Sequence, residues 1–385
     1  MGMRSVVAAS GGTRTGTPGV APVRHGEKRR DRPLLVALVP AHDEESTITA
    51  AVASLKRQAV PPDRIVVVAD NCSDRTQLRA RGAGAQVFRS TRNLRRKAGA
   101  LNQALRRILR GLEDDDVVMV TDADSVIADD WTTVALDTLA RPGVGAVGGI
   151  FYGQRGAGLI GLLQRMEYVR YARQLARRTD CRAFVLTGTA TALRVSTLRE
   201  VAAARRTGLL AGGTPLGPDV FYDEQNITED SELTLAVKTL GHACLSPMEC
   251  WVSTEVMPTW RALWRQRVRW QRGALDNLRT YGITRVTWPY AARQAWSLVE
   301  LVMLLVYLTL TAVTAVNGTL HVQPFWLVVG AVFVTERVVT VLRAGPLAVL
   351  VALSLVLDMG YGLFKHVVNL KCFYDIGRGR AAAWG

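Results

Sequence analysis

Hydrophobic and polar positions divide the chain into two parts of different character. From Leu34 to about Arg293, short apolar runs alternate with segments that place apolar residues on one helical face. From Trp296 to about His366, Leu, Val and Ala dominate. The first pattern is typical of a soluble α/β domain and the second of membrane-associated helices. The main domain boundary is therefore expected just before Trp296.

Short apolar runs in the first part predict buried strands. These runs lie at residues 34–39, 64–69 and 117–121, and a further short strand is expected at residues 85–89. A helical pattern over residues 45–58 separates the first two runs, and another helical pattern follows Lys97. Strands that alternate with helices predict a parallel sheet covered on both faces, in which ligands bind beyond the carboxyl ends of the strands.

Three apolar stretches form the second part, at residues 298–316, 325–342 and 347–363. The first is long enough to span a bilayer. The second contains Glu336 and Arg337 and the third contains Asp358, so each is either a span whose charges face other helices or a buried hairpin or interfacial segment. Three spans place the basic tail opposite the α/β domain, whereas two spans and one interfacial segment keep both on one side, as the charge favours. The tail's basic residues are Lys365, Lys371, Arg378 and Arg380.

The formal net charge of the 385 residues is +15, which attracts anionic lipids, phosphorylated substrates or nucleic acids. Much of this charge lies in the N-terminal arm and in a segment directly before the apolar stretches. Positive charge beside an apolar span marks the cytoplasmic side of a membrane, so we expect the α/β domain in the cytoplasm. The basic residues of the segment are Arg261, Arg265, Arg267, Arg269, Arg272, Arg279, Arg285 and Arg293.

The N-terminal arm and the cysteines narrow the picture further. The first 32 residues lack an apolar core long enough for a signal peptide and are rich in Gly, Arg, Pro and Thr, so disorder is expected. The cysteines show no C-x-x-C spacing, which predicts reduced thiols and neither a disulfide framework nor a zinc site. They are Cys72, Cys181, Cys244, Cys250 and Cys372.

Two aspartates, Asp122 and Asp124, follow the apolar run at residues 117–121. At a strand end, residues i and i+2 point to the same side. Two carboxylates there can hold Mg²⁺ or Mn²⁺, which bridges diphosphate oxygens. The alternative is an Asp-rich turn, because Asp also favours strand ends.

Asp70 ends the run at residues 64–69. Its carboxylate can accept hydrogen bonds from a nucleobase or ribose at the same edge of the sheet. The alternative is that Asp70 and Asn71 only cap the loop.

Asp230 lies at the start of a helical pattern, after Thr228 and Glu229. Acidic residues stabilise a helix N-terminus in any case, so a capping role is one interpretation. The other is that Asp230 acts as a general base and takes the proton from an acceptor hydroxyl.

Gln266, Arg269 and Trp270 share one face of an amphipathic helix because they are spaced i, i+3 and i+4. Trp270 offers a flat apolar plate for a sugar ring, and Arg269 offers paired donors to phosphate. The alternative is a helix at the membrane surface, where Trp and Arg are favoured regardless of function.

Seven segments, in this order along the chain, resemble motifs of family 2 glycosyltransferases of the type that includes cellulose, chitin, hyaluronan and poly-N-acetylglucosamine synthases. They lie at residues 39–44, 68–71, 97–102, 122–124, 188–189, 228–230 and 266–270. The resemblance covers roughly residues 34–273. It implies an α/β GT-A fold, Rossmann-like with a mostly parallel sheet, followed by C-terminal transmembrane helices.

The resemblance also implies an inverting single displacement and a role for each matching residue. Asp230 is the expected base, and Asp122 and Asp124 are the expected ligands of Mg²⁺ or Mn²⁺. Gly188, Thr189 and Trp270 are expected at the acceptor. The expected donor-binding residues are Pro40, Ala41, Glu44, Asp70, Lys97, Asp122, Gln266 and Arg269.

The expected function is transfer of a hexose or N-acetylhexosamine from a UDP-sugar to a glycan or lipid-linked acceptor, for cell-surface polysaccharide or glycolipid, without a nucleic-acid partner. The alternatives are a polyprenyl-phosphate glycosyltransferase and a non-enzymatic basic membrane protein. Three C-terminal spans are few for a polysaccharide channel, so processive synthesis would need a homo-oligomer or a membrane partner. The expected parts are an arm (1–32), the GT-A domain (33–258), interface helices (259–295), membrane helices (296–366) and a tail (367–385).

Overall fold

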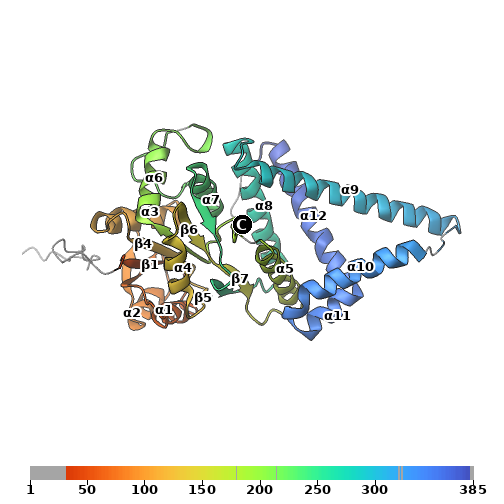
Figure 1. The fold of residues 1–385 in the computed structure, drawn as a ribbon, viewed down its shortest axis with the longest axis horizontal. Coiled ribbons are helices and arrows are strands. Elements are labelled where there is room, and N and C mark those ends of the chain that lie inside the picture. The colour runs from red at the N-terminus through yellow and green to blue at the C-terminus, as the bar shows by residue number, and fades with distance from the viewer. Residues whose placement is uncertain (1–31, 179, 214, 320, 322–323, 382–385) are drawn as a thin grey trace, which may run out of the picture.

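The computed structural model describes residues 32–178, 180–213, 215–319, 321 and 324–381. The predicted disorder of the N-terminal arm therefore concerns residues that, apart from Arg32, lie outside the described part. An α/β domain lies at one end of the molecule and long helices extend from the other (Figure 1).

The main sheet has seven strands in the order β3-β2-β1-β4-β8-β6-β9. Strands β1 to β4 run parallel to one another, and β8 runs antiparallel between β4 and β6. The prediction of a mostly parallel α/β sheet is confirmed, and its four expected strands are present. The strands are β1 (Leu35–Ala41), β2 (Arg64–Ala69), β3 (Gln86–Arg89), β4 (Val117–Thr121), β6 (Val144–Gly148), β8 (Ala190–Arg194) and β9 (Ala243–Leu245).

Strand β1 continues through Pro40, where the apolar run predicted its end. Proline removes a ladder donor and is disfavoured inside a central strand. The pairing of β1 with β4 stops at Leu38, opposite Val120, whereas the pairing with β2 continues to Ala41. Pro40 is therefore compatible with the sheet because it lies beyond the ladder on the β4 side.

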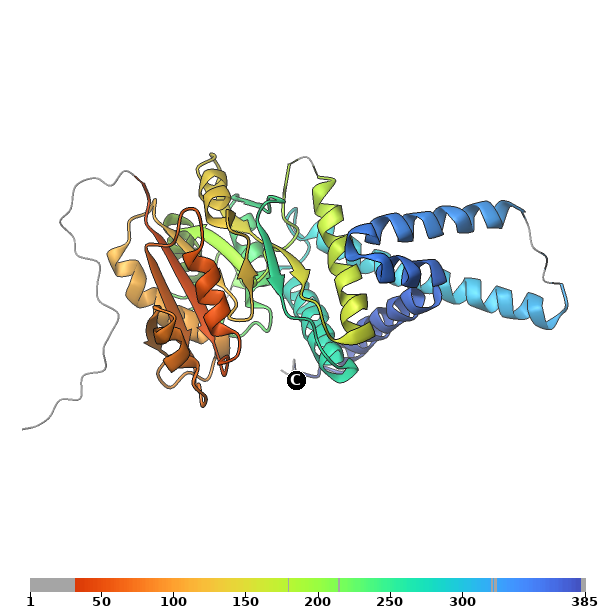
Figure 2. The ribbon, with the colours of Figure 1, turned by 90° about the horizontal axis from the view of Figure 1, so that it is seen from below.

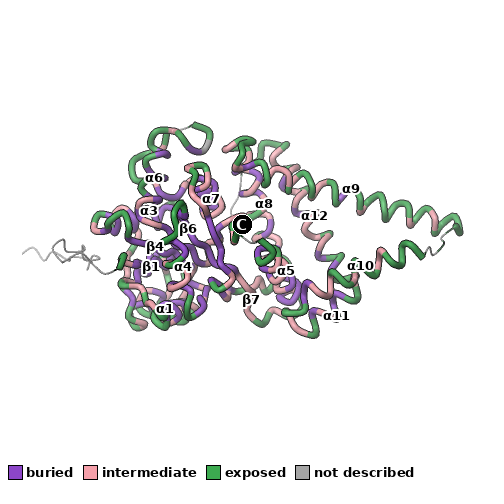
Figure 3. Tube along the Cα trace, in the orientation of Figure 1, coloured by how far each residue is buried: buried purple, intermediate pink, exposed green. Residues whose placement is uncertain are grey.

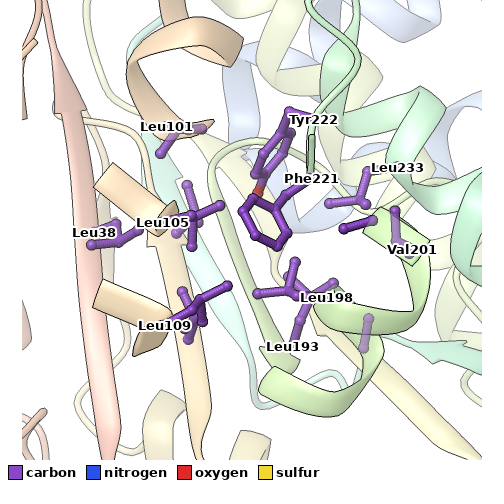
Figure 4. Close-up of a cluster of buried hydrophobic side chains, with 14 of the residues drawn as sticks. Leu38, Leu101, Leu105, Leu109, Leu193, Leu198, Val201, Phe221, Tyr222 and Leu233 are labelled. Carbon is purple, nitrogen blue, oxygen red and sulfur yellow. The ribbon is translucent and has the colours of Figure 1, made fainter. Parts of the chain in front are cut away.

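Helices cover both faces of this sheet, as the alternating pattern predicted. Alternate residues of β1 point to opposite faces, so Leu38 packs with α3, α6 and α7, and Leu35 packs with α1, α2 and α4. Figure 4 shows the first of these cores, in which Leu38 lies beside Leu105. The helices are α1 (Ile48–Lys56), α2 (Thr76–Gly82), α3 (Arg96–Ile108), α4 (Trp131–Leu139), α6 (Val195–Arg206) and α7 (Glu229–Thr239), with 3-10 turns η1 (Leu109–Gly111) and η2 (Ala211–Gly213).

A second, three-stranded sheet connects the domain to the remaining helices. Its order is β5-β10-β7, with β10 antiparallel to β5 and parallel to β7. Helices α5 and α8 lie between this sheet and the C-terminal helices (Figure 2). These elements are β5 (Val126–Ile127), β7 (Ile150–Gly153), β10 (Trp251–Thr254), α5 (Gly158–Ala176) and α8 (Trp260–Tyr281).

The C-terminal part consists of α9 (Trp288–Val316), α10 (Pro324–Val341), η3 (Leu342–Ala344), α11 (Pro346–Ser354) and α12 (Val356–Gly377). Among the described residues, α9 and the 324–344 segment are each long and apolar enough to cross a membrane. The third predicted stretch is bent by 78° between α11 and α12, so it is either one broken span or a re-entrant segment. Most residues of α9 and α10 are exposed (Figure 3), as expected of helices that a bilayer would cover.

Two of the three charged residues inside the apolar stretches, Asp358 and Arg337, pair across helices, whereas Glu336 lies 3.9 Å from Arg337 of its own helix. Asp358, 3% exposed, accepts hydrogen bonds from Arg170 of α5 at 2.7 Å and from Arg337 of α10 at 2.9 Å. Such pairing is what charges among apolar helices require. Asp358 therefore joins the α/β domain to the C-terminal helices.

Candidate active site

Lys97 and Asp122 meet beyond the carboxyl edge of the main sheet. Asp122 directly follows β4, and Lys97 is in the first turn of α3. The Lys97 Nζ atom lies 2.6 Å from Asp122 Oδ1 and 3.4 Å from Glu229 Oε1. Burial opposes the charged form, but the neighbouring carboxylates raise the pKa of Lys97. The lysine therefore stays charged and joins β4, α3 and α7.

The loop before β8 runs between Lys97, Asp122 and Asp230. The Gly188 amide donates to Asp230 Oδ2 at 2.8 Å. A Cβ atom at Gly188 would lie 2.8 Å from Lys97 Nζ and 3.4 Å from Asp122 Oδ2. A side chain at this position would therefore shift the Lys97 ammonium away from its place beside Asp122. The Thr189 carbonyl accepts from the Asp122 amide at 3.3 Å, so the predicted acceptor-side loop is fixed against the Asp-rich turn.

Asp230 also makes the contact that a helix N-terminus requires. Its Oδ1 accepts from the Ser231 amide at 2.8 Å. The capping interpretation is therefore compatible with the geometry, but it occupies only one of the two carboxylate oxygens. The other oxygen faces the loop at Gly188, beside Lys97.

Four carboxylates gather around the end of β4. Burial, together with the charge of Asp122, raises the pKa of Asp124 to about 7. Glu44 and Glu255 add to this repulsion, and burial likewise raises the pKa of Glu44. A divalent cation would relieve the repulsion, and carboxylate oxygens suit Mg²⁺ or Mn²⁺. Glu255 was not predicted, because nothing in the sequence shows that β10 returns to this edge.

Asp70, Pro40 and Ala41 lie side by side at the ends of β2 and β1. The Asp70 amide donates to the Ala41 carbonyl at 2.9 Å. The buried Asp70 carboxylate accepts from Ser90 at 2.6 Å and from Asn93 at 2.8 Å through Oδ1. Asp70, Pro40 and Ala41 thus form a second part of the carboxyl edge of the main sheet, next to the part formed by Lys97 and Asp122.

The α3 segment contains two structural residues whose roles were not predicted. A Cβ at Gly99 would lie 2.2 Å from Asn93 Oδ1, so glycine lets the loop after β3 approach the helix. Asn102 is fully buried and donates to the Tyr222 carbonyl at 2.8 Å, while its Oδ1 accepts from the Phe221 and Tyr222 amides. These contacts fix the loop that leads to Asp230.

Helix α8, which carries Gln266, Arg269 and Trp270, packs against the start of α7. A Cβ at Gly273 would lie 2.2 Å from Thr228 Oγ1, so the helix approaches the Asp230 loop with no room for a side chain. Asn277 accepts from Asn226 of the same loop at 2.6 Å. The contact at Gly273 therefore brings α8 against the loop that bears Asp230. Gln266, Arg269 and Trp270 lie within two helical turns of Gly273.

The sequence of this chain is similar to those of known glycosyltransferases. Residues 33–273 match the family described as Glycosyltransferase like family 2. The chain is 28% identical to the probable glycosyltransferase YdaM of Bacillus subtilis (strain 168), over 64% of this chain and 56% of that protein. It is 24% identical to the poly-β-1,6-N-acetyl-D-glucosamine synthase of Staphylococcus aureus (strain COL), over 63% of this chain and 54% of that protein. The chain thus spans about half the length of these curated relatives.

The fold is similar to that of a solved glycosyltransferase. The mannosyltransferase PcManGT from Pyrobaculum calidifontis, determined in complex with GDP-Man and Mn²⁺, superposes with a TM-score of 0.56. The identity is 20%, over 91% of this chain and 89% of that one. This likeness confirms the expected GT-A architecture.

The fold and the acidic edge of the sheet thus define a glycosyltransferase of the GT-A class. The family match covers more than half of the chain, and the chain belongs to glycosyltransferase family 2. The predicted family and the prediction of an enzyme are confirmed. The alternative of a non-enzymatic membrane protein is therefore wrong.

Proposed function

We propose that this enzyme transfers a hexose or N-acetylhexosamine from a UDP-sugar to a hydroxyl of a glycan or lipid-linked acceptor, with inversion. The observation that carries the proposal is the meeting of Lys97, Asp122 and Asp230 around Gly188. The Lys97 ammonium, the Asp122 carboxylate as a candidate metal ligand and Asp230 as a candidate base thus lie within one small region. The likeness to a poly-N-acetylglucosamine synthase supports a role in cell-surface polysaccharide or glycolipid synthesis.

Asp230 is proposed as the general base. The acceptor oxygen would form its bond to the anomeric carbon while the bond from that carbon to the diphosphate breaks. The hydroxyl proton would pass to the Asp230 carboxylate, and the electron pair would leave with the nucleoside diphosphate. In the described conformation the Gly188 amide donates to Asp230 Oδ2 and orients the carboxylate, which keeps a further lone pair for the acceptor hydroxyl.

The donor would lie along the edge formed by β2, β1 and β4. Asp70, with Pro40 and Ala41, would contact the nucleoside, and Lys97 would face the diphosphate. Asp122 and Asp124, with Glu44 nearby, would hold Mg²⁺ or Mn²⁺. When bound, such an ion supplies positive charge that stabilises the departing diphosphate. Gln266 and Arg269 would add hydrogen bonds to the diphosphate from α8.

The acceptor would approach between the Gly188–Thr189 loop and Trp270. The Trp270 side chain is partly exposed on α8, where its ring can pack against a sugar. We place the enzyme in the cell membrane with its α/β domain in the cytoplasm. The basic residues of the 259–295 segment, which ends within the first turns of α9, support this side. Processive synthesis would require a homo-oligomer or a membrane partner.

The test is a turnover assay on the full chain in lipid nanodiscs. UDP- and GDP-sugars would be offered with short β-glycans or polyprenyl phosphate, with and without Mn²⁺ or Mg²⁺. We expect metal-dependent release of UDP and a glycosylated glycan or glycolipid detected by mass spectrometry. Turnover from GDP-sugars alone would overturn the donor assignment, and polyprenyl phosphate as the only acceptor would favour the alternative enzyme.

Asp230→Asn tests the base assignment directly. We expect the transfer rate to fall by about 10²–10⁴-fold, while donor affinity stays near that of the wild type. Asp137→Asn, an exposed aspartate of α4, is the matched control and should transfer normally. If Asp230→Asn were as active as this control, another residue would be the base.

A further inference from the structure

Arg267 is a buried arginine in the middle of the α8 segment that carries Gln266 and Trp270. Its side chain is 6% exposed, and its Nη2 donates to Glu167 Oε2 of α5 at 2.6 Å. The Tyr361 hydroxyl of α12 donates to the same oxygen at 2.7 Å. Lys365 Nζ lies 3.6 Å from the other oxygen of Glu167. One carboxylate therefore joins α5, α8 and α12.

The guanidinium of Arg267 also lies over the ring of Trp270. The distance from its central carbon to the ring centroid is 4.3 Å, within the range of a cation–π contact. Trp270 itself is 37% exposed. One end of Arg267 is therefore fixed by Glu167, and its flat face supports an aromatic ring that has a free surface.

The pair of Arg267 and Glu167 remains charged over the ordinary pH range. Burial alone would raise the pKa of Glu167, but Arg267 and Lys365 lower it to about 2. Leaving a buried charge without its partner costs free energy, so the contact with Glu167 holds the Arg267 side chain in this position. The contact is a fixed support and does not behave as a pH switch.

Aromatic packing sets how α12 lies along α8. The Phe364 ring contacts those of Trp260 and Trp264 edge-on, with centroids 5.4 and 5.9 Å apart. Tyr361 stacks on Phe364 with an interplanar angle of 11°. The position of the Tyr361 hydroxyl at Glu167 thus depends on how these two helices pack.

We propose that Glu167, Arg267 and Tyr361 form a positioning relay through which α12 sets the orientation of Trp270, and with it the affinity for the acceptor. The inference rests on the proposed function, which places Trp270 at the acceptor. The three relay residues are positioning residues and touch neither substrate. The C-terminal helices are then part of the acceptor site as well as a means of membrane attachment.

The kinetic test uses Tyr361→Phe and Glu167→Gln, separately and combined. We expect each single variant to raise the acceptor KM about three- to tenfold, with an unchanged donor KM and unchanged donor hydrolysis without acceptor. The acceptor KM of the double variant should not exceed that of the more impaired single variant, because both changes interrupt the same chain of contacts. Tyr374→Phe, a tyrosine near the end of α12 that contacts Arg378 and Arg380, is the control and should match the wild type.

A second measurement tests the relay without requiring catalytic turnover. In protein labelled with 5-fluorotryptophan, the Trp270 fluorine resonance is assigned from its loss in Trp270→Phe. It should shift in Tyr361→Phe and stay in place in Tyr374→Phe. An unmoved resonance, an unchanged acceptor KM, or equal loss of donor and acceptor affinity would overturn the relay. Absence of any nucleotide-sugar turnover by the wild type would instead overturn the proposed function, and the resonance would still decide on the relay.

Discussion

Asp124 lies two residues beyond Asp122, among carboxylates that repel its charge. Burial and Asp122 raise its pKa to about 7, well above the 3.8 of a free aspartate. The ionised form is therefore disfavoured without a cation, and the folded state loses stability through this group as pH rises from about 4 to 7. A cation that binds here must displace a proton below pH 7.

This competition predicts pH-dependent metal affinity. We expect the Kd of Mn²⁺ to be about tenfold lower at pH 8 than at pH 6, because the ionised fraction of a group of pKa 7 rises about tenfold. Calorimetric titration at the two pH values measures it. Asp124→Asn should bind Mn²⁺ weakly at both, whereas Asp129→Asn, an exposed aspartate nearby, should behave as the wild type. Equal affinity at both pH values would mean that Asp124 is not a ligand.

At the scale of helices, the site depends on how closely α8 approaches the start of α7. Gly273 permits this approach, since a Cβ there would lie 2.2 Å from Thr228 Oγ1 and 2.4 Å from its Cγ2. Thr228 is buried and lies two residues before Asp230. A side chain at position 273 would therefore push apart the helix that carries Trp270 and the loop that carries the proposed base.

Gly273→Ala tests this contact. Alanine usually stabilises a helix interior by about 1 kcal/mol relative to glycine, but overpacking costs about 1–3 kcal/mol. We expect a net loss of stability in thermal unfolding and a transfer rate at least tenfold lower. Gly82→Ala, at the end of α2 with no atom near the added Cβ, should be neutral or slightly stabilising. Full activity in Gly273→Ala would show that the two elements can separate without harm.

The elements that the sequence predicted well are those defined by local pattern. The runs that became β1, β2 and β4 are mostly apolar, whereas β3 is short and partly exposed, and each was located within about two residues. Strands β6 and β8 were not predicted, because Gly, Ala and Thr make up much of both segments and give a weak apolar pattern. The bend at Leu355, where φ is +55°, was also not predicted, because the hydrophobic pattern carries no information on backbone conformation.

The same distinction applies to the site. Asp70, Asp122 and Lys97 could be predicted because strand ends and a motif mark them. Glu255 and Gly273 could not, since their importance comes from contacts between segments far apart in the chain. Sequence thus predicted candidate chemical groups from local pattern, and the structure added residues whose neighbours are distant in the chain.

At the scale of the whole molecule, polar contacts hold the α/β domain against the C-terminal helices. Asp358 is the centre of one set, with Arg170 of α5 on one side and Arg337 of α10 on the other. The Arg170 contact is bidentate, with distances of 2.7 and 3.0 Å. Two arginines therefore share one buried carboxylate, and Arg337 also lies 3.9 Å from Glu336.

Asp358→Asn should loosen the two halves from each other. Removing one partner of a fully buried charge pair typically costs about 3–5 kcal/mol. We expect a smaller loss here, because the side chains of Arg170 and Arg337 are partly exposed. We expect a lower unfolding temperature in detergent and faster proteolysis between α8 and α9, at residues 282–287. Glu336→Gln, a more exposed charge on α10, should change stability by less than about 0.5 kcal/mol. If the two variants unfolded alike, Asp358 would not be needed to hold the domain against its C-terminal helices.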